Sequence, residues 1–133
     1  MRVQGRCHCG EIAYEATVDA SRVGICHCTD CQMLTGSAYR ATVPASKEEF
    51  VLRTGKSKTY LKTAESGAKR IHAFCPNCGS PVYSAAASDP QTYSLRVGCL
   101  QQRTELLPSK QQWCQSALPW VLDLSSIRQV RRQ

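Results

Sequence analysis

Cysteines are the residues of this sequence best suited to chemistry: there are nine, and seven of them fall in three short groups. The groups are Cys7 and Cys9, then Cys26, Cys28 and Cys31, then Cys75 and Cys78. Cys-x-Cys and Cys-x-x-Cys spacings are typical of metal ligands. Because the first 25 residues contain no apolar signal core, we expect a cytoplasmic protein whose thiols stay reduced rather than form disulfides.

The segment CPNCG at residues 75–79 predicts half of a tetrahedral zinc site. Cys75 and Cys78 would supply two thiolates, and Gly79 lets the chain turn tightly beside them. A redox Cys-x-x-Cys would continue into a helix, which Gly79 and Pro81 disfavour. The Cys-x-Cys pair near the N-terminus completes the set, since residues i and i+2 of an extended chain point the same way. We therefore expect a closed, structural zinc site made by Cys7, Cys9, Cys75 and Cys78.

The remaining group, CHCTDC, offers three thiolates and no obvious fourth ligand. A closed site would have to recruit Cys99, Cys114 or His72. Cys99 continues an apolar alternation, Cys114 has no partner spacing, and His72 is interpreted as a hydrogen-bonded surface histidine. Three protein ligands with an open fourth position are typical of catalytic zinc. We therefore expect a second, more labile zinc at a catalytic centre formed by Cys26, Cys28 and Cys31.

A short helix is predicted over residues 30–35, where Thr29 and Gln32 form a capping box and Gly36 suits the C-terminus. Cys31 would lie in its first turn, where free backbone N–H groups and the helix dipole favour a thiolate. Within the same motif, Asp30 is expected to be a favourable first-turn charge. His27 is expected to pack beside the ligands or support them rather than bind the metal.

Short alternations of apolar and polar residues dominate the rest of the chain and predict mainly antiparallel β-structure. No linker or repeat interrupts them, so residues 1–133 are expected to form one domain. The alternating positions are Ile12, Tyr14, Ala16 and Val18; Tyr39, Ala41 and Val43; Phe50 and Leu52; Ile71 and Ala73; and Tyr93, Leu95, Val97 and Cys99.

The formal net charge of +7 is only a weak indication of nucleic-acid binding. Arg128, Arg131 and Arg132 lie in the last six residues, and a short basic tail is more often a solvated end. The nine aromatic residues are mostly used on strand faces rather than interleaved with basic ones. No stretch approaches the roughly 20 apolar residues that span a bilayer. We therefore expect neither a nucleic-acid nor a membrane partner.

The three cysteine groups, in this order, resemble the glutathione-dependent formaldehyde-activating enzyme family. The likeness runs through RCHCG, CHCTDCQMLTGSAY, FCPNCGSPVY, VGCL and the late PW at 119–120. It implies a zinc-containing β-tent fold, and it implies the same division into a structural zinc and a second, labile zinc at the active site. It also implies carbon–sulfur lyase chemistry, in which glutathione joins formaldehyde to give S-hydroxymethylglutathione. One departure is that many members carry a histidine shortly before a late Trp, whereas here Gln111 and Gln112 precede Trp113.

The sequence chemistry agrees with such an enzyme. A thiol that enters the fourth position of a zinc centre loses its proton and becomes a nucleophile, and nearby Lys and Arg would hold the carboxylates of glutathione. The competing interpretations are a non-catalytic zinc module that binds nucleic acid or protein, and a zinc buffer that uses the labile site without a substrate.

Overall fold

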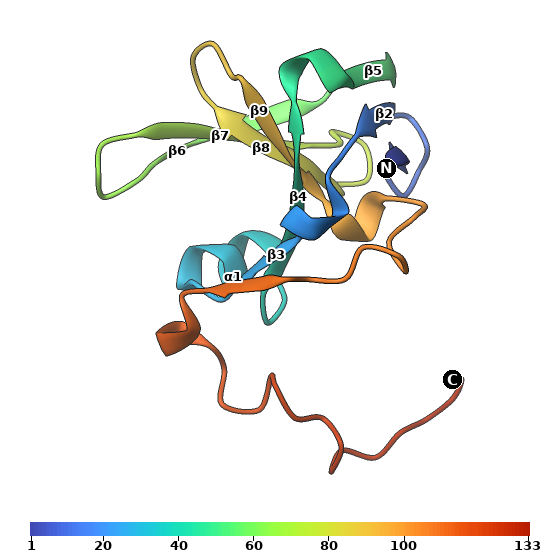
Figure 1. The fold of residues 1–133 in the computed structure, drawn as a ribbon, viewed down its shortest axis with the longest axis vertical. Coiled ribbons are helices and arrows are strands. Elements are labelled where there is room, and N and C mark those ends of the chain that lie inside the picture. The colour runs from blue at the N-terminus through green and yellow to red at the C-terminus, as the bar shows by residue number, and fades with distance from the viewer.

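The computed structural model describes residues 1–133 and contains two β-sheets and one α-helix (Figure 1). The smaller sheet has the order β1-β2-β5, and both of its pairings are antiparallel. Its strands are β1 (Arg2–Arg6), β2 (Ala13–Thr17) and β5 (Phe50–Thr54). The prediction of a mainly β protein with antiparallel sheets and one short helix is confirmed.

The larger sheet has seven strands in the order β10-β3-β4-β9-β8-β7-β6. All neighbours pair antiparallel except β10 and β3, which are parallel. Its strands are β3 (Gly24–Cys26), β4 (Arg40–Ser46), β6 (Lys58–Thr63), β7 (Lys69–Phe74), β8 (Pro81–Ala86), β9 (Thr92–Arg96) and β10 (Lys110–Gln112). The single helix α1 (Thr29–Thr35) follows β3 directly.

The hydrophobic core lies between the two sheets. All four alternating residues of the first predicted strand are buried, at 1–4% exposure. The core cluster also takes Val43 from β4, Val82 from β8 and Leu95 from β9. Phe50 of β5 stacks on Tyr93 of β9 with ring centroids 4.7 Å apart, so aromatic contacts join the sheets. Period-two alternation thus identified the inward positions of β2, Val43 and Leu95 correctly, whereas Tyr39 and Leu52, which were also predicted to face inward, are exposed.

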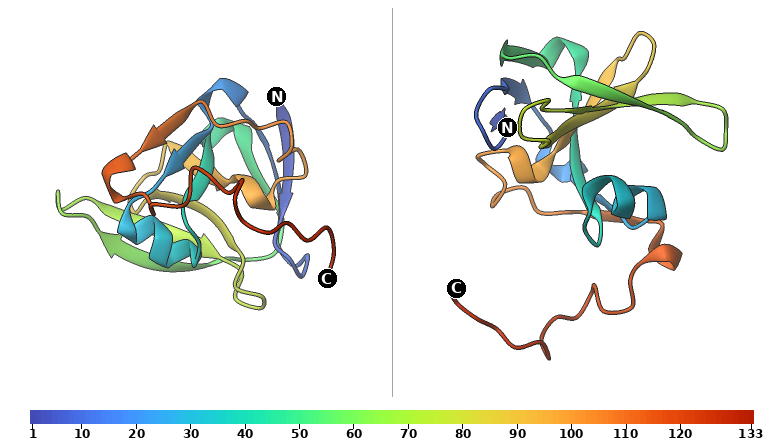
Figure 2. Two further views of the ribbon diagram at one scale, coloured as in Figure 1. Left: turned by 90° about the horizontal axis from the view of Figure 1, so that it is seen from below. Right: turned by 180° about the vertical axis from the view of Figure 1, so that it is seen from behind.

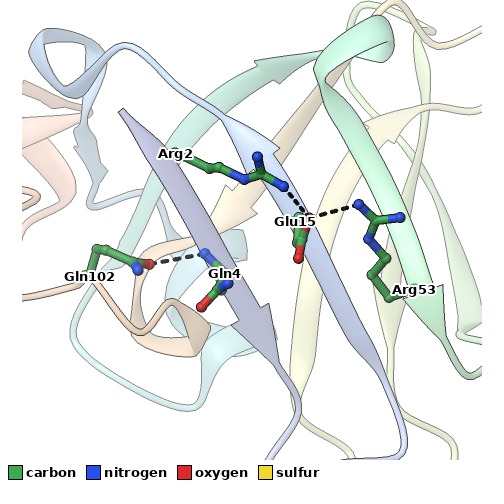
Figure 3. A network of polar contacts seen from close by, with 5 residues as sticks. All are labelled: Arg2, Gln4, Glu15, Arg53 and Gln102. Atoms are coloured by element: carbon green, nitrogen blue, oxygen red, sulfur yellow. Dashed lines mark hydrogen bonds and ion pairs between the residues drawn. The ribbon is translucent and has the colours of Figure 1, made fainter.

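The outer face of the smaller sheet carries a network of polar contacts (Figure 3). Glu15 of β2 accepts hydrogen bonds from Arg2 of β1 and from Arg53 of β5, each at 2.8 Å. The bonds from Arg53 and then Arg2 hold the pKa of the Glu15 carboxyl below its usual value. The backbone N–H of Gln4 donates to the side-chain oxygen of Gln102, which ties β1 to the segment after β9. Exposed ion pairs contribute little stability, so this network adds little to the free energy of folding.

The chain beyond residue 116 contains no strand and runs apart from the sheets in Figure 1 and in the right view of Figure 2. Its apolar side chains are largely exposed, namely Trp120, Leu122, Leu124, Ile127 and Val130. The three arginines of the last six residues are exposed as well. None of the helices has the length and hydropathy that a bilayer crossing requires.

Candidate metal centres

The four cysteines predicted to form the structural site converge in the structure, and we call them the closed group: Cys7, Cys9, Cys75 and Cys78. Their sulfur atoms all lie within 4.8 Å of one another. The Sγ atoms of Cys7 and Cys9 are 3.5 Å apart, and those of Cys9 and Cys75 are 3.7 Å apart. Tetrahedral zinc with Zn–S bonds of about 2.3 Å would place its sulfurs about 3.8 Å apart. The closed group therefore fits a four-thiolate zinc ion.

Cys7 and Cys9 reach this position from a turn, and the predicted extended conformation is wrong. Strand β1 ends at Arg6, the N–H of Gly10 donates to the carbonyl of Cys7, and Gly10 has φ 85°. The Cys7 sulfur also accepts the backbone N–H of Ile12 at 3.2 Å. Because the turn carries backbone N–H groups toward sulfur, it suits a thiolate better than a strand would.

Cys75 and Cys78 lie in the loop between β7 and β8, as the knuckle motif predicted. The N–H of Gly79 donates to the Cys75 carbonyl at 2.9 Å, and Gly79 has φ 77°. Strand β8 begins at Pro81, so no helix follows. The Ser80 hydroxyl, followed by backbone N–H groups, lowers the pKa of Cys78 to about 5, which favours a thiolate at this ligand.

Cys26, Cys28 and Cys31 also converge within 4.8 Å, and we call them the three-cysteine group. Cys26 ends β3, Cys28 is the N-cap of α1, and Cys31 lies in the first turn. No histidine or carboxylate joins the three sulfurs. Three soft sulfur donors around one point fit a zinc ion with a further coordination position.

The cap of α1 differs from the predicted capping box. The sulfur of Cys28, rather than the Thr29 hydroxyl, accepts the backbone N–H of Cys31 at 3.3 Å. The Gln32 side chain donates instead to the carbonyls of His27 and Ser116. A ligand sulfur thus replaces the capping oxygen, while the C-terminus is as predicted, with Gly36 at φ 62°.

The predicted thiolate at Cys31 is not what its surroundings favour. Cys31 is fully buried, and burial raises the pKa of its thiol to about 12, assisted by the hydrogen bond with Cys28. Desolvation therefore raises the pKa of Cys31 by more than the helix N-terminus lowers it. A metal bound here must displace the proton, since ligating sulfur is deprotonated.

The three residues weighed as possible fourth ligands lie elsewhere. Cys99 sits in a 3-10 turn after β9 rather than on the strand face, and its thiol donates to the carbonyl of Pro81 at 3.1 Å. Cys114 is exposed. His72 is buried at 8% exposure, so the prediction of a surface histidine is wrong. None of these residues joins the three-cysteine group.

His27 packs beside the three-cysteine group and is 1% exposed. Its Nε2 lies 2.8 Å from the side-chain oxygen of Gln111, and its backbone N–H donates to the Gln112 carbonyl. Gln111 and Gln112 are the residues before Trp113, where the sequence departs from the family that it resembles. Strand β10 carries them alongside β3 in a parallel pairing that no local sequence pattern indicated. The glutamines therefore border the site through His27.

One face of the larger sheet gathers basic side chains next to the three-cysteine group, and we call it the cationic face. Opposed residues of adjacent strands share a face, and the register aligns Lys62 with Arg70 and Arg40 with Cys26. Arg96 of β9 belongs to the same face through its pairing with Thr42. The cationic face is made by Arg40, Lys62, Arg70 and Arg96. Only the strand register brings these residues together, so sequence reasoning missed them.

Helix α1 lies against the cationic face. Lys62 of β6 forms a 2.7 Å ion pair with Asp30 in the first turn of the helix. Asp30 therefore links the helix to β6, in addition to its favourable interaction with the helix dipole. A nitrogen of the Arg40 guanidinium lies 2.6 Å from the Cys31 sulfur. The arrangement places three thiols that could bind a metal ion beside a fixed positive charge.

The family model for glutathione-dependent formaldehyde-activating enzyme matches residues 2–116. The chain belongs to this family. The matched range includes both cysteine groups and ends before Pro119 and Trp120, which had counted toward the resemblance.

Two individual proteins extend the comparison. The chain is 29% identical over 95 residues to an uncharacterized lyase of Schizosaccharomyces pombe, and the match covers 71% of this chain and 65% of that protein. A crystal structure of a Rhodobacter sphaeroides protein has 22% identity and a TM-score of 0.63. That likeness covers 84% of this chain and all of the other chain, and at this identity it shows a shared fold.

Proposed function

We propose that this family member is a zinc-dependent enzyme of the carbon–sulfur lyase type that adds a glutathione-like thiol to formaldehyde or a related small electrophile. The observation that carries the proposal is the three-cysteine group, which has one ligand fewer than the closed group and adjoins the cationic face. The lyase name of the fission-yeast relative and the family's own description support the same reaction class.

The reaction is a nucleophilic addition. The thiol sulfur forms a bond to the aldehyde carbon, the C=O π bond opens, and the thiol proton ends on the resulting oxygen. Zinc held by Cys26, Cys28 and Cys31 would supply Lewis-acid chemistry and lower the pKa of a substrate thiol. No electron is gained or lost overall, so the step needs no redox partner.

The residues around the group would bind and orient the thiol. Arg70 lies on the cationic face and is half-buried, so its charge is poorly screened and can attract a carboxylate, whereas Lys62 already pairs with Asp30. His27 contacts Gln111 and Tyr39 and would support the segment that carries the ligands rather than enter the reaction.

A Cys31→Ser variant tests the proposal. We expect it to lose about one zinc per chain and its glutathione binding while the fold survives, because the closed group stays intact. Zinc content, melting temperature and glutathione binding measured anaerobically provide the readouts, with Cys114→Ser as control because Cys114 is exposed and outside both groups. X-ray absorption showing four protein sulfurs at both metals, unchanged by glutathione, would rule out an open position.

A further inference from the structure

We propose that Arg40 is a positioning residue that supplies the fixed counter-charge of the three-cysteine group, an inference that rests on the proposed function of that group as a metal centre. Three thiolates around a divalent ion leave a net charge of −1. Arg40 places a guanidinium nitrogen, Nη2, 2.6 Å from the Cys31 sulfur. Because a guanidinium stays protonated in proteins, the pair would make the loaded centre electrically neutral.

The backbone and two side chains fix Arg40 in this place. Arg40 is paired with Cys26 across β3 and β4, so its side chain starts beside one ligand and ends at another. Its second terminal nitrogen, Nη1, lies 3.4 Å from Nδ1 of His72, and Nη2 of Arg96 lies 3.2 Å from the same Nδ1. Guanidinium nitrogens only donate, so Nδ1 is the acceptor for both arginines and His72 is neutral.

The cluster is electrostatically costly unless a negative group stands beside it. Arg96 is 6% exposed, and its Nε and Nη1 have no hydrogen-bond partner. Burying a cation without acceptors is strongly unfavourable. Asp30, the acidic residue nearest in sequence to the group, is already paired with Lys62. The loaded three-cysteine group would supply such a negative group, because its Cys31 sulfur lies 2.6 Å from Arg40.

The charge of Arg40 should therefore matter for metal uptake. When three thiols take up a divalent ion they lose their protons, so a neutral cluster becomes an anionic one. A cation in contact with sulfur stabilises the anionic metal-bound cluster more than the neutral cluster of three free thiols. Hydrogen bonds to charged groups have net strengths that correspond to about tenfold to hundredfold in affinity.

The test is a Co²⁺ titration of the full chain preloaded with one equivalent of zinc, followed by the sulfur-to-cobalt charge-transfer absorption. We expect Arg40→Gln to weaken Co²⁺ binding at least tenfold and Arg40→Lys to stay within about threefold of wild type. Arg53→Gln is the matched control, because Arg53 is an exposed arginine paired with Glu15 on the other sheet. Circular dichroism of each zinc-loaded variant verifies folding.

Two results would overturn the inference while leaving the proposed function intact: an unchanged affinity in Arg40→Gln, or a loss in folded Arg40→Lys as large as tenfold. The lysine variant decides the matter alone if the glutamine variant does not fold. A wild-type chain that takes up no Co²⁺ beyond its one zinc would overturn the proposed function, and the inference with it.

Discussion

The cysteine thiols of this protein have different pKa values because their surroundings differ. The hydroxyl and backbone donors around Cys78 lower the pKa of its thiol to about 5, whereas burial raises the pKa of Cys31 to about 12. A ligand with a low pKa gives up its proton readily to a metal, and a ligand with a high pKa does so only against a larger cost. Each group contains both kinds of thiol, since the pKa of Cys75 in the closed group is raised to about 11 and that of Cys28 in the three-cysteine group is lowered.

Cys78→Ser should unfold much of the domain. Structural zinc contributes about 10–16 kcal/mol in small zinc domains, and most of this would be lost with one ligand. We expect at least one zinc fewer per chain and a large drop in melting temperature, measured by metal analysis and calorimetry. Cys114→Ser should change neither quantity, and a Cys78→Ser chain that kept both would refute the assignment of the closed group.

His72 should resist protonation. Burial first, and then the charges of Arg40 and Arg96, lower its pKa from 6.5 to about 4. Below pH 6.5 the unfolded chain therefore binds more protons than the folded one, so stability falls as the pH drops from 6.5 toward 4. The loss attributable to His72 is roughly 3 kcal/mol. NMR titration of the ring gives the pKa directly, and His72→Gln should flatten this part of the stability profile relative to an exposed-site control, His8→Gln.

At the scale of the elements, the smaller sheet positions half of the closed group. Strands β1 and β2 form the hairpin whose turn carries Cys7 and Cys9, and Gly5 of β1 lies opposite Tyr14 of β2. The Tyr14 ring is 1% exposed and covers Gly5, where a Cβ atom would meet ring atoms. The hairpin therefore depends on a glycine at this position.

Gly5→Ala should destabilise the fold by about 1–3 kcal/mol, as expected for overpacking in a core, and should weaken metal retention at the closed group. Chemical denaturation and zinc release to a chelator measure the two effects. Gly98→Ala is the matched control, because a Cβ there meets nothing within 4 Å and its φ is not positive. Equal stabilities of the two variants would mean that the Tyr14 ring can move aside at little cost.

At the scale of the whole molecule, the cationic face holds four of the 17 Lys and Arg side chains and the exposed tail holds three, while the other ten lie elsewhere. The tail arginines lie beyond the residues matched by the family model, whereas the cationic face adjoins the three-cysteine group. This division favours a role for charge in holding an anionic small molecule over a role in nucleic-acid binding.

Deleting residues 128–133 should leave zinc content, melting temperature and glutathione binding unchanged, since these residues form no strand or helix. We expect no submicromolar, salt-sensitive binding of DNA or RNA by the full chain, measured by fluorescence anisotropy at several salt concentrations. Binding that weakens steeply with salt and disappears on truncation would support the nucleic-acid module instead.

The sequence by itself determined the ligand groups and the fold class, because both are written in local spacing. Cysteines two or three residues apart can reach one metal ion, the sulfurs of each predicted group converge, and Gly79 and Gly36 occupy the positive-φ positions that their motifs required. Period-two alternation likewise identified the buried face of β2. These signals extend over a few residues and need no knowledge of distant contacts.

Only the tertiary structure decided what surrounds those ligands. The parallel pairing of β10 with β3 brings Gln111 to His27, and the register of β3 with β4 brings Arg40 to Cys31. Burial then reversed the expected thiolate at Cys31 and enclosed His72 among arginines. Each of these outcomes depends on which strands become neighbours and how much water they exclude, and neither quantity is encoded in the spacing of the residues concerned.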